Sequence, residues 1–248
     1  MYLPDFGEER DTLINKAIQE GVERIYLPNI DSSSLPLMKD LCESFPKNCF
    51  PMMGLHPCSV KENYKEELSL IEKELKTGNY KAVGEIGMDL HWDLSFVEEQ
   101  KIAFRKQIEW AKALQLPIVI HSRKAYPEIF KIVEELNDDK LFGIFHCFTD
   151  SLKNAEKIIS FGGFKMGVGG VVTYKNAGFA EVLKDIDIQH IVLETDAPYL
   201  TPVPFRGKRN ETAYLIHIAE KVAEVYGISL AEVAEITSKN ALEIFERS

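Results

Sequence analysis

The chain has 248 residues, 45% of them apolar and 27% charged, which is ordinary for a globular protein and close to the size of one β/α barrel. No apolar run approaches the ~20 residues that cross a bilayer, the acidic N-terminus lacks the features of a secretory signal, and four scattered cysteines predict a cytoplasmic protein with reduced thiols. The net charge of -10 excludes a protein that coats nucleic acid through its overall field, but not an enzyme with a local basic cleft.

Short apolar runs alternate with amphipathic segments along the whole chain. The runs predict seven strands, at Arg24–Ile30, Cys49–Leu55, Lys81–Ile86, Pro117–Ile120, Leu141–Phe145, Phe164–Val168 and His190–Leu193. The segments between and after them predict helices, at Glu8–Gln19, Leu35–Ser44, Tyr64–Thr77, Val97–Leu114, Pro127–Glu135, Leu152–Phe161, Ala177–Lys184, Thr212–Tyr226, Leu230–Thr237 and Asn240–Arg247.

This order of elements predicts an α/β protein with a parallel sheet covered by helices. No linker of Pro, Gly or Ser divides the chain, so residues 1–248 are expected to form a single domain. A closed (β/α)8 barrel needs eight strands, whereas seven are visible and the chain opens on a helix. A TIM-type barrel that lacks its first strand explains both facts. An open doubly wound sheet would tolerate seven strands, but its G-x-G-x-x-G turn is absent.

Ionisable residues stand at or just after the ends of five predicted strands, where a barrel places its chemistry. Each has a simpler explanation by itself, because a lone His after a strand is commonly structural and a lone carboxylate commonly caps a helix. Together, two His and two carboxylates at one rim are typical of a divalent metal site. The candidates are Glu85, His121, His146 and Asp196, with His56 at the same rim.

The segments that carry these residues resemble the TatD family of metal-dependent deoxyribonucleases. In chain order they are Gly54–Pro57, Val83–Asp89, Leu116–Arg123, Phe145–Phe148, Gly169–Ala177, Leu193–Leu200 and Pro202–Asn210. The resemblance covers nearly the whole chain. It implies a TIM-like barrel with one or two divalent ions, Mg2+, Mn2+ or Zn2+, that hydrolyses phosphodiester bonds of DNA.

The same resemblance implies a role for each candidate ligand. Glu85 is expected to bridge both metals, His121 and His146 to bind one of them, and Asp196 to bind the other and act as general base. Glu85 and Asp196 are therefore the expected catalytic residues. A divalent ion would activate water near neutral pH and stabilise the charge that builds on the phosphate.

Basic and aromatic residues near the same rim are candidates for substrate binding. Arg123, Arg206 and Arg209 are expected to contact phosphates of a DNA substrate that is single-stranded or bound at a 3' end. His56 is expected to hydrogen-bond either a phosphate or the attacking water. Lys208 belongs to the same basic loop. Three aromatic residues are expected either to stack on bases or to pack locally, namely Trp92, Tyr174 and Tyr199.

The sequence departs from the family pattern at its start. The family opens with a strand that ends in Asp-Thr-His-x-His-Leu, whereas Met1 stands where that motif should end and no His-x-His occurs in the chain. Three explanations are a start codon assigned too late, which we favour, a trimmed polypeptide and a natural loss. Because the absent His pair would share a metal with Asp196, we expect reduced metal content and low nuclease activity for this chain.

Two other functions remain open at this point. The same residues would suit an amide or carboxyl-ester hydrolase, as in related amidohydrolase barrels. The basic residues and the absence of a lysine at a strand end that could be carbamylated favour phosphate. The third hypothesis is a catalytically inactive remnant that binds nucleic acid or a partner.

Overall fold

The computed structural model describes residues 1–247, which form two compact units. The central unit is Arg24–His146. The terminal unit joins Met1–Glu23 to the part of the chain that begins at Cys147.

The strands of the central unit are all parallel. β1 (Ile25–Pro28) pairs with β2 (Cys49–Met52), and β3 (Val83–Asp89), β4 (Ile118–Arg123) and β5 (Gly143–Phe145) pair in that order. A single bridge joins Met53, just after β2, to Val83 at the start of β3. The carboxyl ends of β3, β4 and β5 therefore lie at one edge of their sheet.

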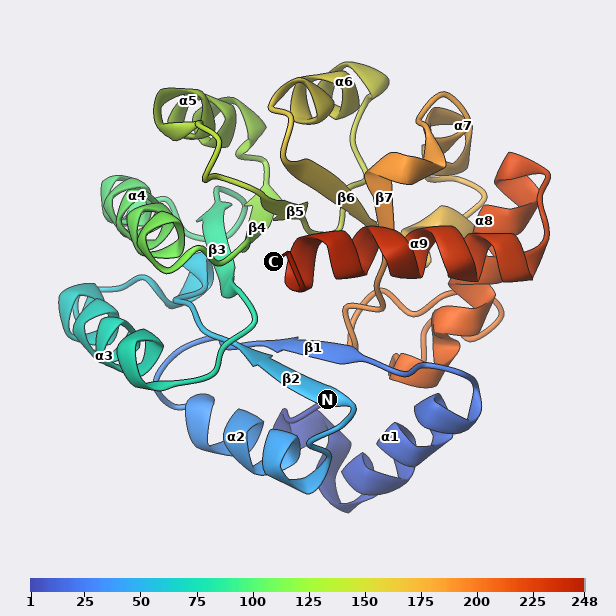
Figure 1. The fold of residues 1–248 in the computed structure, drawn as a ribbon, viewed down its shortest axis with the longest axis horizontal. Coiled ribbons are helices and arrows are strands. Elements are labelled where there is room, and N and C mark those ends of the chain that lie inside the picture. Colours follow the sequence, from blue (N-terminus) through green and yellow to red (C-terminus); the bar gives the residue numbers. More distant parts are fainter. Residues whose placement is uncertain (248) are drawn as a thin grey trace. The chain divides into compact units, whose positions relative to one another are not determined.

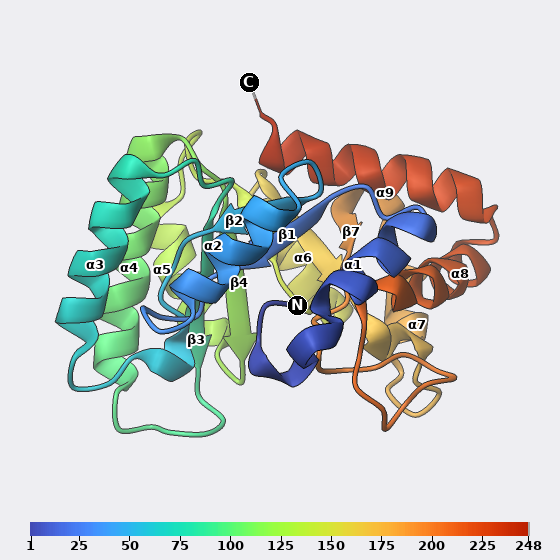
Figure 2. The same ribbon diagram turned by 90° about the horizontal axis from the view of Figure 1, so that it is seen from below.

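Four helices cover the strands of the central unit on one side (Figure 1). They are α2 (Leu35–Ser44), α3 (Tyr64–Thr77), α4 (Val97–Leu114) and α5 (Tyr126–Leu136), and a 3-10 turn at Pro57–Ser59 precedes α3. Figure 2 shows α3, α4 and α5 side by side. Ile71 on α3, Phe104 on α4 and Ile129 on α5 are fully buried, and each such side chain contributes about 1.5–3 kcal/mol to stability.

The terminal unit holds the remaining elements. Its strands β6 (Phe164–Val168) and β7 (Ile191–Leu193) are parallel neighbours. Its helices are α1 (Arg10–Gln19), α6 (Leu152–Ser160), α7 (Phe179–Leu183), α8 (Leu215–Tyr226) and α9 (Leu230–Phe245), with 3-10 turns at Pro4–Glu9, Gly170–Thr173, Ile188–His190 and Thr212–Tyr214. Asn240 fixes α9 to β7, because its side-chain amide donates to the carbonyls of Ile188 and Ile191.

The structure confirms all seven predicted strands and corrects their ends. β3 and β4 run further than their apolar runs, so Glu85 lies in the middle of β3 rather than near its end, and His121 lies inside β4 rather than after it. Within residues 1–247, no strand precedes α1, whose predicted start at Glu8 falls in the 3-10 turn Pro4–Glu9. No helix in this part of the chain combines the length and apolar character needed to cross a membrane.

The prediction of two final helices was wrong. Residues Leu230–Phe245 form one helix, with Ser229 and Glu232 in a capping box at its start. The expected break after Thr237 does not occur because neither Pro nor Gly stands there. The Thr237 hydroxyl bonds back to the carbonyl of Val233, an interaction that helices accommodate.

Candidate metal centre

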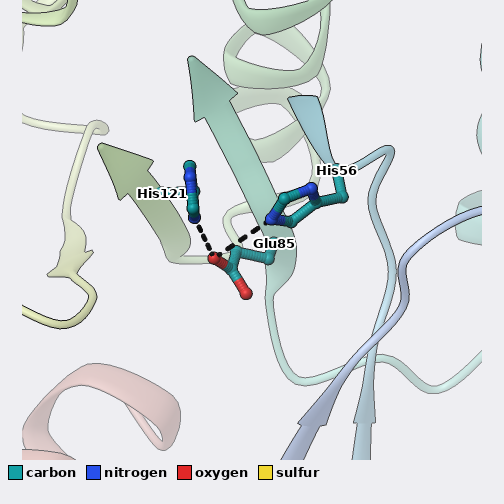
Figure 3. Close-up of side chains that lie close together, drawn as sticks. All are labelled: His56, Glu85 and His121. Atoms are coloured by element: carbon teal, nitrogen blue, oxygen red, sulfur yellow. Dashed lines mark hydrogen bonds and ion pairs between the residues drawn. The ribbon is translucent and has the colours of Figure 1, made fainter. Parts of the chain in front are cut away.

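Glu85 is the centre of a group of imidazoles in the central unit. Its side chain lies inside β3 and is almost completely buried. Glu85 Oε1 lies 2.8 Å from His121 Nδ1, 3.6 Å from His56 Nε2 and 3.7 Å from His146 Nε2. Figure 3 shows the carboxylate between His56 and His121. The structure thus brings together three of the four predicted ligands and adds His56 to them.

The charges in this group stabilise one another. Burial disfavours the Glu85 carboxylate, but the charge of His146 and the hydrogen bonds of His121 and His56 outweigh it and hold the pKa of Glu85 well below its usual range. Burial also disfavours the His121 imidazolium, yet hydrogen bonds with Asp89 and Glu85 raise the pKa of His121 to about 9. Positive charge around Glu85 therefore stabilises its buried carboxylate.

The backbone before His56 is held by a helix. The Leu55 N–H donates to Gln107 Oε1 over 2.7 Å, and Gln107 Nε2 donates to the Leu55 carbonyl over 3.3 Å. Gln107 is buried on α4. His56 Nδ1 accepts from the Cys58 N–H over 3.1 Å, which directs Nε2 toward Glu85. Gln107 thus fixes the backbone before His56, and the Cys58 N–H orients its imidazole.

Asp89 is a residue of the site to which the sequence assigned no role. Its Oδ2 lies 3.0 Å from His121 Nε2, and its Oδ1 accepts from the His91 N–H over 2.9 Å. Gln100 on α4 bonds to both the N–H and the carbonyl of Asp89. The spacing from Glu85 was the available signal, because residues i and i+4 of a strand lie on one face.

The donor set fits a divalent cation. One ligand atom from each of His56, Glu85 and His121 lies within 4.8 Å of the others. Imidazole nitrogen with carboxylate oxygen is the chemistry that Zn2+ and Mn2+ accept. A cation would supply the positive charge that protons supply here. His121 would then offer the nitrogen that now faces Glu85, while Asp89 retains the other, an arrangement common among metal-ligating histidines.

Asp196, the fourth predicted ligand, lies on the terminal unit just after β7. It adopts a left-handed backbone conformation (φ 55°), which Asp tolerates better than most residues, and its carbonyl accepts from the Tyr199 N–H. Nearby, Glu194 accepts from the Cys147 N–H over 2.7 Å. The ligand and general-base roles of Asp196 stay predictions.

The predicted phosphate-binding arginines have different surroundings. Arg123, at the end of β4, is exposed and lies over the Trp92 ring, 5.0 Å from its centroid. Arg206 is exposed and lies 4.3 Å from the centroid of Tyr174. Arg209, in contrast, bonds to Glu9 and to the Asp5 carbonyl, so its guanidinium anchors the N-terminal segment.

The three aromatic residues predicted to stack on bases or pack locally also differ in their surroundings. Trp92 and Tyr199 are 70% and 61% exposed, so both rings are accessible. The Tyr174 hydroxyl donates to the Thr201 carbonyl, which gives Tyr174 a structural contact besides Arg206. The base-stacking role of each stays a prediction.

Comparisons with known proteins agree on one family. Residues 1–246 match the family model of TatD related DNase. The chain is 36% identical to an uncharacterized metal-dependent hydrolase of Bacillus subtilis (strain 168), YabD, over 97% of this chain and 94% of that protein. It is 28% identical to the 3'-5' ssDNA/RNA exonuclease TatD of Erwinia tasmaniensis, over 97% and 94%.

A solved structure shows the same fold. The crystal structure of YjjV, a TatD homolog from Escherichia coli K12, superposes with a TM-score of 0.91 at 26% identity, over 98% of this chain and 94% of that one. The predicted α/β fold of TIM-barrel type is thereby confirmed. Family model, relatives and fold together show that this chain belongs to the TatD-related family of metal-dependent hydrolases.

Proposed function

We propose that the chain hydrolyses phosphodiester bonds of DNA, at single-stranded regions or 3' ends, with a divalent cation held at Glu85. The main observation that supports this proposal is the buried Glu85 carboxylate, which lies within 3.7 Å of three imidazole nitrogens. The Erwinia relative whose name is that of a 3'-5' ssDNA/RNA exonuclease supports the choice of substrate.

The residues present suggest how the site works. His56 and His121 flank Glu85 and offer nitrogen ligands, and the His146 imidazole lies close to the same carboxylate. Asp89 keeps the His121 ring in place. A divalent cation there, whether Mg2+, Mn2+ or Zn2+, would make water a better nucleophile near neutral pH and offset phosphate charge. Asp196 is the proposed base that takes the proton from this water.

A direct assay tests the proposal. Purified protein is incubated with single-stranded DNA labelled at its 5' end, in EDTA and in Mg2+, Mn2+ or Zn2+. We expect shortening from the 3' end only with metal. Glu85→Gln should abolish it, because the substitution removes the charge at the centre of the site. Glu66→Gln, an exposed glutamate on α3, is the matched control and should cleave like the wild type.

Parallel assays with amide and carboxyl-ester substrates separate the alternative functions. Hydrolysis of amides or carboxyl esters without cleavage of DNA would favour the amidohydrolase-type function and contradict the proposal. Absence of every activity in all metals would favour the inactive remnant.

A further inference from the structure

Trp92 is the large apolar side chain most exposed to solvent among residues 1–247, at 70%. It lies on the segment that joins β3 to α4, three positions after Asp89. One exposed apolar residue is normal on a protein surface and needs no function. Trp92 differs from an isolated exposed residue because a cationic side chain and a residue of the candidate metal centre lie beside it.

Arg123 lies over the Trp92 ring, with its guanidinium carbon 5.0 Å from the ring centroid. It extends from the end of β4, where it is paired in register with Asp89. Arg123 and the adjacent Lys124 are exposed to solvent. The chain has 39 acidic residues, and these two exposed side chains can offer positive charge to an anionic ligand.

Asp89 links Trp92 to the candidate metal centre. Trp92 and Asp89 border the same small pocket, together with Cys58 and Lys61. At about 40 Å³ this pocket has room for only a few water molecules, so a nucleobase would not fit inside it. Asp89 in turn holds His121. Asp89 therefore connects the pocket that Trp92 borders to His121, one of the candidate ligands of the cation.

We propose that Trp92 and Arg123 form a platform that binds one nucleotide of a single-stranded substrate beside the bond to be cut. The base stacks on the indole and the guanidinium contacts a phosphate, a combination that single-strand-binding proteins use without sequence preference. This inference rests on the proposed function and specifies its substrate. A base within a duplex is already stacked and does not offer its face.

The two tryptophans of the chain permit a binding test. In Trp110→Phe, Trp92 is the sole tryptophan and reports on its own surroundings. Fluorescence is titrated in EDTA, which prevents metal-dependent cleavage, with a short oligothymidylate and with an abasic oligonucleotide of equal length. We expect quenching by the oligothymidylate and binding about 10-fold tighter than that of the abasic strand. Equal affinities, or no quenching, would overturn the platform.

A kinetic test uses the same pair of strands with metal present. Trp92→Ala should lower kcat/KM for oligothymidylate about 10-fold and change that for the abasic strand less than about two-fold, whereas Trp92→Phe should retain most of the activity. Leu94→Ala is the matched control, because Leu94 is an apolar residue on the same segment that is 64% exposed, and it should change neither value. Equal losses on both strands in Trp92→Ala would refute a role in base binding.

The two proposals fail in different ways. If the wild type cleaves neither strand in any metal, the nuclease proposal fails, while the fluorescence titration still decides whether Trp92 binds a base.

Discussion

Asp89 contacts His121 on the ring nitrogen that does not face Glu85. Asp89→Asn keeps an oxygen that can accept from this nitrogen but removes the negative charge that favours and orients the ring. We predict that the affinity for Zn2+ or Mn2+ falls about 10- to 100-fold, the usual effect of losing such a partner. Isothermal titration calorimetry of metal-free protein measures it.

Two further variants interpret this result. Asp138→Asn removes a carboxylate that pairs with Lys112 on the surface of the same unit, so it should leave metal affinity unchanged. Asp89→Ala, which removes the acceptor as well, should bind metal more weakly than Asp89→Asn. Unchanged affinity in both Asp89 variants would show that Asp89 does not position His121.

How far single residues were predictable follows from their place on the strands. Glu85, His121 and His146 were visible because a polar residue at the end of an apolar run is unusual. Asp89 was not singled out because it stands beyond the apolar run Lys81–Ile86, and only the structure shows that β3 continues to it. The surroundings of Arg209 were also unpredictable, because its partner Glu9 is distant in the sequence.

At the scale of elements, Gly87 determines how closely β3 approaches β4. Its φ is +134°, and a Cβ at this position would collide with the carbonyl oxygen of His121. We predict that Gly87→Ala lowers the free energy of unfolding by about 3 kcal/mol, because it adds steric overlap to an unfavourable backbone conformation. Urea denaturation measures the change.

A comparison with Gly21 separates the effect of steric overlap from that of backbone strain. Its φ is also positive, at +90°, but a Cβ there would meet no heavy atom within 4 Å. Gly21→Ala should therefore cost only about 1 kcal/mol, from backbone strain alone. Equal losses in the two variants would mean that the approach of β3 to β4 does not depend on Gly87.

The types of the elements were predictable, and their ends less so. Apolar runs marked every strand of the structure because strands buried on both faces have no polar alternation. The ends differ where a strand continues beyond its predicted run, as β3 does through Met88 to the polar residue Asp89. The continuity of α9 was missed because the polar residues Thr237 and Asn240 resemble a helix break in the sequence. In the structure, the Thr237 hydroxyl bonds to the Val233 carbonyl within the helix, and the Asn240 amide bonds to the Ile188 carbonyl outside it.

For the whole molecule, the alternation of runs and helices was enough to predict the barrel type. The two compact units were not foreseen, because no change in composition marks Arg24 or Cys147. The net charge of -10 was interpreted as excluding general attraction to nucleic acid. It also means that any cation is attracted to this protein, so specific metal binding must be distinguished from attraction by the overall charge.

Thermal unfolding makes that distinction. A cation that binds only the folded protein stabilises it by about 2.7 kcal/mol at 100 times its Kd. For a chain of this size the midpoint should rise by about 5–10 °C. Because three imidazoles surround Glu85, Zn2+ or Mn2+ should raise it more than Mg2+ at equal concentration. Attraction by the overall charge would act alike on all three ions and persist in Glu85→Gln, whereas binding at this site would be lost. A larger effect of Mg2+, or an undiminished shift in the variant, would contradict a metal site built on these histidines.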